Sequence, residues 1–315
     1  MYHMKKILVT GAFGLVGTDL VLALQEKYGK DNVIAAGLTQ IPAGFSGISE
    51  LADVRDKGRI EELLSRYAIT EVYHLAGLLS AGGEKNPNLA WDINLNGLKV
   101  ILDLAVQYKL KVFWPSSIAV FGPTTPKEKT PQHTILEPST IYGATKVAGE
   151  LLCQYYNLKY GLDVRSLRYP GLIAYKAEPG DGTTEYAVSI FYNALRNKPF
   201  VCFLKKDAVL PMMYIDDAIR GTIALMDADP KKLTVHTSYN FSAISFSPQE
   251  IFDEIKKQVP TLKISYQPDE RQKTADSWPK IIDDSFARVD WQWQHEYTLE
   301  KMVSEMLKQL KRKLS

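Results

Sequence analysis

The stretch ILVTGAFGLVG, residues 7–17, places Gly11, Gly14 and Gly17 directly after a short apolar run. The apolar run predicts a buried β-strand, and the amphipathic segment 14–28 predicts a helix. Glycines at such a junction let the backbone approach a ligand closely, and the free N–H groups of a helix N-terminus favour an anion. The spacing therefore predicts a loop that holds the pyrophosphate of a dinucleotide. A tight turn that only packs the helix onto the strand is the alternative.

Short β-rich runs and amphipathic stretches alternate through the first half of the chain. The pairs are KILVT with 14–28, NVIAAG with 57–67, EVYHLA with 88–107 and KVFWPSS with 141–160, and DVRSLRY follows them. This alternation is typical of βαβ units and predicts a Rossmann-like α/β fold with a doubly wound parallel sheet. Right-handed crossovers place the carboxyl ends of the strands along one edge, where ligands bind.

The regular alternation of short apolar runs and amphipathic stretches ends near residue 171. Helices are expected at 182–196, 247–258 and 298–312, and turn-rich links such as YKAEPGDG separate them. We therefore predict a dinucleotide-binding domain at residues 1–170 and a smaller, mainly substrate-binding or lid domain at residues 171–315. The chain is expected to return to the first domain around residues 208–242, through MMYIDDAIRGTIALMD and YNFS.

The charge balance and the cysteine content argue against several classes of protein. With 38 basic and 36 acidic side chains in 315 residues, a net charge of +2 indicates neither a nucleic-acid partner nor an anionic membrane surface. Cys153 and Cys202 lie in apolar contexts and indicate neither a disulfide framework nor a zinc site. No apolar run is long enough to span a membrane, and KKILVTGA follows MYHM without a signal or transit peptide, so we expect a cytoplasmic protein.

A carboxylate is expected at the end of the second strand, where it would hold the ribose hydroxyls of an adenosine. VIAAGLT places Gly37 there instead, and no arginine stands beside it to bind a 2′-phosphate. Asp53, at the end of the next strand in LADVRD, is a candidate for holding the adenine, although a lone Asp there is as often a cap or turn residue. These features favour NAD as the cofactor and leave NADP as an alternative.

IYGATK, residues 141–146, contains a tyrosine and a lysine one helical turn apart, Tyr142 and Lys146. Upstream, FWPSSIAVFG ends a strand with Ser116 and Ser117, and strand ends converge at one edge of a parallel sheet. A free tyrosine has a pKa of about 10. The Lys146 ammonium and a positive nicotinamide ring would both favour phenolate, so Tyr142 could accept the proton of a substrate alcohol. Ser117 would hold the same oxygen, with Ser116 as a less favoured substitute, and Lys146 would also bind the ribose. A helix face that only packs, with its lysine extending to solvent, is the alternative.

At this point the chain resembles the extended short-chain dehydrogenase/reductase family, which includes nucleotide-sugar epimerases. TGAFGLVG, HLAG (74–77), NLNG (94–97), SSIAVFG (116–122), YGATK and MYIDDA (213–218) occur in order over nearly the whole length. The resemblance implies NAD binding by further residues as well, namely Leu75, Ala76, Gly77, Asn94 and Tyr169.

Within this family, sugar-nucleotide enzymes usually carry an Arg-x-x-Asn-x-x-Gly-Pro segment after the sixth strand. RYPGLIAY, residues 168–175, has no asparagine there, which disfavours a sugar-nucleotide substrate. WPSSIAVFGPTTPKEKTP, GDGTTEYAVSIFY and PMMYIDDA resemble the short-chain type of L-threonine 3-dehydrogenase instead. This resemblance implies oxidation of the L-threonine side-chain hydroxyl to 2-amino-3-ketobutyrate, with a substrate site lined by Ser80, Ser117, Tyr142, Thr183, Thr184 and Trp278. Gly37 departs from this group as well, because Asp is usual there.

Two alternatives remain open. A nucleotide-sugar epimerase or dehydratase of the same fold would keep its NAD bound and show no net NADH formation. A scaffold or sensor that binds NAD without catalysis is the other, and the intact serine, tyrosine and lysine argue against it. His74 has no second metal ligand at a usable spacing, so we expect no metal site. The resemblance also implies a homodimer formed through the helix of Tyr142 and Lys146 and the helix at 88–107.

Overall fold

The computed structural model describes residues 5–38, 41–42 and 44–314. The expectation about a leader segment concerns residues 1–4 and lies outside this range. The chain divides into two compact units. Unit 1 contains residues 1–117, 140–168 and 219–239, and unit 2 contains residues 118–139, 169–218 and 240–315.

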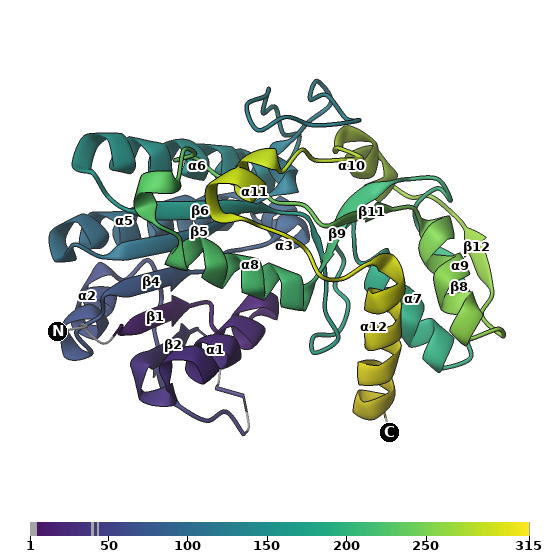
Figure 1. The fold of residues 1–315 in the computed structure, drawn as a ribbon, viewed down its shortest axis with the longest axis horizontal. Helices are drawn as coiled ribbons and strands as arrows, with labels where there is room; N and C mark the ends of the chain where they lie inside the picture. The colour runs from purple at the N-terminus through teal and green to yellow at the C-terminus, as the bar shows by residue number, and fades with distance from the viewer. Residues whose placement is uncertain (1–4, 39–40, 43, 315) are drawn as a thin grey trace. The chain divides into compact units, whose positions relative to one another are not determined.

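A seven-stranded sheet with the order β10-β6-β5-β4-β1-β2-β3 contains all the predicted strands of the first half (Figure 1). Its strands are β1 (Ile7–Thr10), β2 (Val33–Gly37), β3 (Ile48–Leu51), β4 (Glu71–His74), β5 (Lys111–Ser117), β6 (Val164–Tyr169) and β10 (Tyr239–Asn240). The pairs β1–β2, β1–β4, β2–β3 and β4–β5 are parallel. The predicted Rossmann-like α/β fold is confirmed, and the strand order reverses between β1 and β4, where such sheets bind ligands.

The helices of the first half follow the predicted order. They are α1 (Leu15–Tyr28), α2 (Lys57–Arg66), α3 (Ser80–Lys85), α4 (Pro87–Trp91), α5 (Gly97–Tyr108) and α6 (Ile141–Tyr160). A π-helical turn, η2 (Asp92–Asn96), joins α4 to α5, so the helix expected at 88–107 is interrupted in its first half. Thr140 caps the start of α6, because its hydroxyl accepts from Gly143 N, and Gly161 caps the end of the helix with a left-handed backbone.

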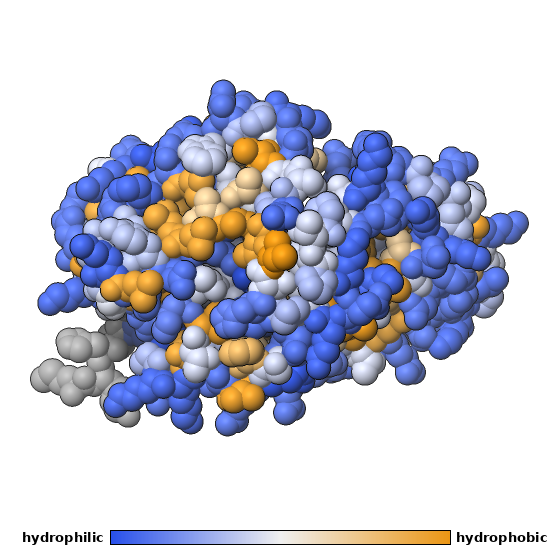
Figure 2. Space-filling view, turned by 90° about the horizontal axis from the view of Figure 1, so that it is seen from above, coloured by the Kyte–Doolittle hydropathy of each residue, from blue (hydrophilic) through white to orange (hydrophobic). Residues whose placement is uncertain are grey.

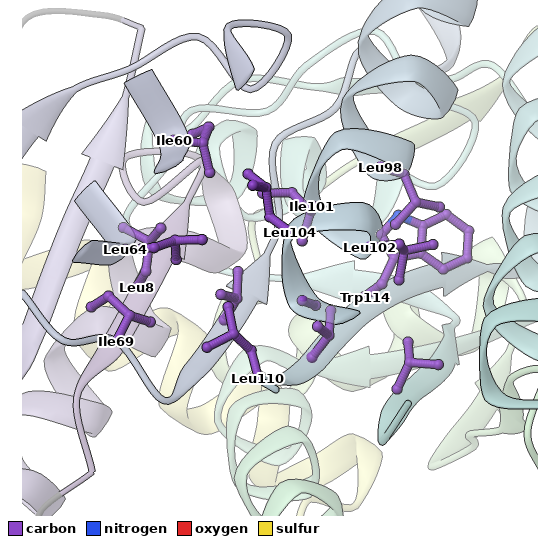
Figure 3. Packing of buried hydrophobic residues seen from close by; sticks show 14 of the residues in the cluster. Leu8, Ile60, Leu64, Ile69, Leu98, Ile101, Leu102, Leu104, Leu110 and Trp114 are labelled. Atoms are coloured by element: carbon purple, nitrogen blue, oxygen red, sulfur yellow. The ribbon is translucent and has the colours of Figure 1, made fainter. Parts of the chain in front are cut away.

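The core of unit 1 lies between one face of this sheet and the helices α2, α5 and α6. Leu8, Ile60, Leu64, Ile101 and Trp114 are among its buried residues (Figure 3). The apolar positions of α2 and α5 recur every three or four residues, so each helix turns one continuous stripe toward the strands. This packing fixes α6, the helix that carries Tyr142 and Lys146.

Unit 2 contains two small sheets and most of the remaining helices. A three-stranded sheet has the order β11-β9-β7 and a two-stranded sheet pairs β12 with β8. The strands are β7 (Gly171–Ile173), β8 (Phe200–Cys202), β9 (Leu210–Tyr214), β11 (Ile244–Phe246) and β12 (Ile264–Tyr266). The helices are α7 (Tyr186–Leu195), α9 (Pro248–Gln258), α10 (Arg271–Ser277), α11 (Ser285–Trp291) and α12 (Leu299–Leu314), and α8 (Ile215–Asp227) runs from this unit into unit 1.

The chain returns to unit 1 over a shorter range than expected. The strand in PMMY is β9, which pairs with β7 and β11 in the three-stranded sheet rather than with the main sheet. Unit 1 resumes at Ile219, within α8, and β10 then forms the edge strand beside β6. Among the described residues, no helix has both the length and the apolar character needed to cross a membrane.

Asp227, the last residue of α8, ties this returning segment to the start of the chain. Its carboxylate accepts hydrogen bonds from Lys5 Nζ and Tyr28 OH, each at 2.8 Å, and also pairs with Lys27. Burial would raise the pKa of Asp227, but the bonds from Lys27, Lys5 and Tyr28 outweigh it and lower the pKa from 3.8 to about 2. A carboxylate with a lowered pKa stabilises the fold above its unfolded pKa, and this contribution is lost as the pH falls from about 4 toward 2.

We expect Asp227→Asn to lower the free energy of unfolding at pH 7 by about 1 kcal/mol, because three donors lose a charged acceptor. Thermal unfolding followed by circular dichroism would measure the difference. The gap between the two proteins should narrow as the pH falls from about 4 toward 2, because the carboxylate of the unfolded chain takes up its proton before that of the folded protein. Glu26→Gln, which changes an exposed carboxylate on α1, is the matched control and should have little effect. An equal loss at every pH would contradict this role.

Candidate active site

The glycine loop between β1 and α1 packs tightly against the segment that follows β4. Gly11 has a φ of +68°, and a Cβ atom there would lie 2.6 Å from Ala76 N. A Cβ on Gly17 would lie 2.2 Å from the carbonyl oxygen of Gly11. Gly14, by contrast, is exposed, has an extended backbone and begins α1. The loop therefore leaves the positive end of α1 accessible beside Gly14, and this cradle fits a pyrophosphate.

The end of β2 is covered by an aromatic side chain. A Cβ on Gly37 would lie 2.8 Å from Cδ2 of Phe13, which belongs to the glycine loop. The Phe13 ring meets the Phe45 ring edge to face, with centroids 5.4 Å apart. Ala52 N donates to Gly37 O at 3.0 Å, so β3 continues directly alongside this position. The apolar rings of Phe13 and Phe45 therefore lie where a ribose-binding carboxylate was expected.

Asp53 lies just beyond β3 and is held by an arginine. Arg55 Nη2 donates to Asp53 Oδ2 at 2.6 Å, and Arg55 Nη1 donates to Asp92 Oδ2 at 2.9 Å. The hydrogen bond from Arg55 is the main reason that the pKa of Asp53 is lowered. Asp53 is therefore ionised at neutral pH and remains a candidate for holding the adenine. Arg55 was not anticipated from the sequence, although its place two residues after Asp53 could have suggested the pair.

The end of β4 joins the glycine loop to the candidate catalytic helix. His74 is fully buried, its Nδ1 lies 2.7 Å from Thr10 Oγ1, and its Nε2 has no hydrogen-bond partner among the described residues. Burial, together with the nearby Lys146 charge, lowers the pKa of His74 to about 3, so the imidazole is neutral. Leu75 N then donates to Thr10 O at 3.0 Å, which places Leu75, Ala76 and Gly77 beside the glycine loop.

Asn94, which was predicted to bind the cofactor, holds the loop after β4 in place. Leu78 N donates to Asn94 Oδ1 at 2.8 Å, and Asn94 Nδ2 donates to Leu78 O and to Thr145 Oγ1, both at 3.1 Å. The residue lies in the π-helical turn η2, and such turns are frequent at functional sites. Asn94 thus connects the loop after β4 to α6, and its predicted contact with NAD stays a prediction.

Tyr142, Lys146 and Ser117 come together where β5 ends against α6. The Ser117 hydroxyl hydrogen-bonds the Tyr142 phenol. Lys146 Nζ donates to Pro115 O at 2.6 Å and lies 5.5 Å from the centroid of the Tyr142 ring. Ser116 bonds Glu150 of the same helix instead, so Ser117 is the serine that reaches the phenol.

The ionisation of this group differs from the expectation in one respect. Burial raises the pKa of Tyr142 to about 12, and the hydrogen bond with Ser117 opposes this only partly. Burial lowers the pKa of Lys146 to about 7, although Cys153 and Glu150 act in the opposite direction. The phenol of the protein alone is therefore less acidic than that of a free tyrosine. Lys146 by itself does not favour phenolate here, and a second positive charge is needed.

A buried ion pair beside Lys146 was missed in the sequence. Glu150 follows Lys146 by one turn of α6, and Arg168 comes from β6. Arg168 Nη2 donates to Glu150 Oε2 at 2.7 Å, and Ser116 Oγ donates to Glu150 Oε1 at 2.6 Å. The spacing 142, 146, 150 places all three side chains on one face of a helix, and this spacing was the available signal.

Ser80, from the predicted substrate residues, is also in unit 1. It is the first residue of α3, and α3 packs against α6, whose first N–H donates to Glu84 Oε1 at 2.8 Å. Ser80 is partly buried. Among the described residues, no group of His, Cys, Asp and Glu side chains could hold a metal ion.

The other predicted site residues belong to unit 2. Thr183 and Thr184 are partly buried just before α7, and a Cβ on Gly171 would lie 2.7 Å from Thr184 Cγ2. Trp278 is partly buried and ends α10. Tyr169 is buried, and its ring lies 5.9 Å from the ring of Phe241. The roles of these four residues stay predictions.

The model of the NAD-dependent epimerase/dehydratase family matches residues 7–240 of this chain. An uncharacterized epimerase/dehydratase of Staphylococcus saprophyticus is 47% identical over 308 residues, which cover 96% of each chain. The chain is also similar to a structure of GalE-like L-threonine dehydrogenase from Cupriavidus necator in its holo form, with 50% identity, a TM-score of 0.95 and coverage of 97% and 99%. For L-threonine dehydrogenase from Clostridium difficile the identity is 46%, the TM-score is 0.97 and the coverage is 99% of each chain.

Proposed function

Because this chain belongs to the NAD-dependent epimerase/dehydratase family, we propose that it oxidises the side-chain hydroxyl of L-threonine to 2-amino-3-ketobutyrate with NAD. The observation that carries the proposal is the hydrogen bond between the Ser117 hydroxyl and the Tyr142 phenol, beside Lys146. An alcohol oxidation needs a group that accepts the hydroxyl proton, and a tyrosine within reach of a lysine can do so.

NAD, when bound, supplies the acceptor for the hydride that leaves the substrate Cβ atom. Gly11, Gly14 and Gly17 would hold its pyrophosphate, and Lys146 would reach its ribose. Tyr142 Oη accepts the proton of the threonine hydroxyl, and Ser117 Oγ orients that hydroxyl by a second hydrogen bond. The phenol must lose its own proton first. Because burial alone raises the pKa of Tyr142 to about 12, the proposal requires positive charge from both Lys146 and the cofactor.

The amino-acid part of the substrate is assigned to Ser80, Thr183, Thr184 and Trp278. Hydroxyl groups suit the carboxylate and ammonium of a small zwitterion, and the indole of Trp278 offers an apolar surface to the methyl group. The similarity to L-threonine dehydrogenases over 97% or more of the chain supports this assignment. A nucleotide-sugar epimerase of the same family is the second candidate, and the name epimerase/dehydratase, which several relatives share, keeps it open.

Formation of NADH, followed by its near-ultraviolet absorbance, tests this function. With L-threonine and excess NAD, we expect many equivalents of NADH per enzyme molecule. L-allo-threonine and UDP-sugars should give little, because the site holds one hydroxyl configuration of a small amino acid. If folded protein forms no NADH with L-threonine, the proposal is wrong. Conversion of a UDP-sugar without net NADH would support the epimerase instead.

Gly37 and Phe13 give a test of how the adenosine end is held. We expect Gly37→Asp combined with Phe13→Leu to tighten NAD binding about tenfold and to weaken NADP binding, because a carboxylate would then reach the ribose hydroxyls. Gly37→Asp alone should gain less, since its Cβ meets the Phe13 ring at 2.8 Å. Isothermal titration calorimetry measures both affinities. Phe13→Leu alone is the control, and equal NAD affinity in all variants would show that the ribose is held elsewhere.

A homodimer through α5 and α6 is proposed on the basis of the exposed apolar residues of α6. Leu151 is 58% exposed, Tyr155 is 50% exposed and Leu158 is 75% exposed. Figure 2, seen from the side on which α6 lies in Figure 1, shows apolar side chains gathered among hydrophilic ones. Light scattering after gel filtration should give twice the mass of one chain, and Leu158→Lys should reduce it; a monomer at all concentrations would contradict the proposal. The cytoplasmic location stays a prediction.

A further inference from the structure

Four consecutive residues of β5 contact one face of α6. A Cβ on Gly149 would lie 2.4 Å from the Trp114 ring, and Lys146 Nζ lies 4.5 Å from the centroid of that ring. Pro115 O accepts from Lys146, Ser116 Oγ donates to Glu150, and Ser117 bonds Tyr142. These four contacts attach the end of β5 to three successive turns of α6, and three of them involve Tyr142 or Lys146, the proposed catalytic groups of this helix.

The attachment through Glu150 is the only one of the four that includes an ion pair, and it is deeply buried. The exposed fraction is 1% for Glu150, 2% for Ser116 and 3% for Arg168. Arg168 binds Glu150 with two nitrogens, Nε to Oε1 at 2.9 Å and Nη2 to Oε2 at 2.7 Å. A two-pronged bond of this kind fixes the carboxylate in both position and orientation. Burial of such a pair is costly, and hydrophobic residues of similar size would often give equal stability, so the pair calls for a reason other than stability.

We propose that Glu150, held by Arg168 and Ser116, is a positioning residue that fixes the end of β5 against α6 and keeps Lys146 charged in its buried place. The inference rests on the proposed function, because it assigns a role in the same proton transfer. Glu150 touches neither the substrate alcohol nor the phenol. It acts through its position one helical turn after Lys146 and through its hold on Ser116, the neighbour of Ser117.

The groups around Lys146 show why a carboxylate matters there. The α6 helix presents Tyr142, Glu150 and Cys153, and β4 presents His74, which is neutral. Arg168 of β6 lies behind Glu150. Among these groups, Glu150 is the carboxylate, and its ion pair with Arg168 is 2.7 Å long. Burial lowers the pKa of Lys146 to about 7, and the charge of Glu150 opposes that fall. Without this charge, Lys146 would be neutral over more of the working pH range and would no longer assist ionisation of Tyr142.

Three variants separate charge from geometry. Glu150→Gln removes the charge but leaves Arg168 buried without its partner, which destabilises the folded protein. Glu150→Gln with Arg168→Gln removes both charges and keeps two amides that can bond each other. Ser116→Ala cuts only the link to β5 and leaves the ion pair intact. Glu50→Gln with Arg59→Gln is the matched control, because it removes another Glu–Arg pair of unit 1, with a 2.7 Å bond, between β3 and α2.

The first measurement needs neither cofactor nor substrate. In protein labelled with ¹³C at the lysine ε-carbons, the resonance absent from Lys146→Arg reports the ionisation of Lys146. We expect its midpoint at about pH 7 in the parent protein. The midpoint should be lower in the double variant of Glu150 and Arg168, and lower still in folded Glu150→Gln protein. The midpoint should be unchanged in the control pair and in Ser116→Ala. An unchanged midpoint in the folded double variant would overturn the proposal.

The second measurement is the dependence of kcat and KM on pH with L-threonine. In the double variant, the profile of kcat/KM should move in the same direction as the Lys146 midpoint, which loss of stability alone would not cause. Ser116→Ala should lower kcat about tenfold with little change in KM, because a misplaced β5 end misaligns Ser117. A normal kcat in Ser116→Ala would refute the positioning role. If the parent protein does not turn over threonine, the proposed function fails, while the lysine titration still decides the role of Glu150.

Discussion

Tyr142→Phe should lower kcat for threonine oxidation by about 10²-fold or more while leaving the fold intact. The substitution removes one hydroxyl that bonds Ser117 and keeps the ring in its place against Lys146. Without the hydroxyl, the assigned acceptor of the substrate proton is gone, and Lys146 does not replace it because its Nζ is directed to Pro115 O. The affinity for NAD should change little, because the phenol is not assigned to cofactor binding. Steady-state kinetics together with calorimetric titration of NAD would separate the two effects.

The matched control is Tyr155→Phe, which removes the same atom from an exposed tyrosine of the same helix. It should retain full activity and full stability. If Tyr142→Phe kept near-normal activity, the proton would have to leave by another route. If both variants lost activity equally, the loss would reflect α6 as a whole rather than the chemistry of one phenol.

Gly17→Ala should be the most damaging single change in the glycine loop. Its Cβ would meet the carbonyl oxygen of Gly11 at 2.2 Å and the carbonyl group of Ala12 at 2.7 Å, and backbone atoms cannot move aside as a flexible side chain can. We expect the free energy of unfolding to fall by about 1–3 kcal/mol or more, as for other overpacked sites. NAD binding should be lost as well, because the start of α1 must shift away from β1. Denaturant unfolding and calorimetry measure the two quantities.

Gly14→Ala is the comparison within the same loop. Gly14 is exposed, has a negative φ, and its Cβ would meet only Gly11 O, at the ordinary contact distance of 3.4 Å. Its stability should therefore stay close to that of the parent protein, whereas NAD binding should weaken because the methyl group stands where a pyrophosphate would approach. Equal stability losses at Gly14 and Gly17 would contradict the geometry of the loop described above.

The fold could be predicted from local patterns because its strands and helices are strongly periodic. The strand ILVT is entirely buried and the α6 helix runs over the predicted residues, 141–160. The π-helical turn at 92–96 could not be predicted, since its residues also suit an α-helix and Asn94 is committed to bonds with distant residues. Likewise, PMMY has the apolar character of a main-sheet strand, and only its pairing with β7 and β11 assigns it to another sheet.

The candidate site shows the same division between local and long-range information. The Tyr142–Lys146 spacing and the glycine spacing are local, so both could be read directly. Glu150 and Arg168 are 18 positions apart and meet only because β6 lies beside β5 in the folded sheet. Phe13 lies over Gly37 only because of the path that the glycine loop takes in the folded protein. The raised pKa of Tyr142 is a consequence of burial, which the sequence around IYGATK does not specify.

The central claim is that the Tyr142 phenol ionises only when the charge of Lys146 is joined by that of the bound cofactor. Spectrophotometric titration of the phenolate band, taken as the difference between the parent protein and Tyr142→Phe, tests it without any substrate. Between about pH 7 and about pH 10, we predict no Tyr142 phenolate in the protein alone and a clear titration in the presence of saturating NAD. If the phenolate absorbance of Tyr142 followed the same pH curve with and without NAD over this range, the account would be contradicted.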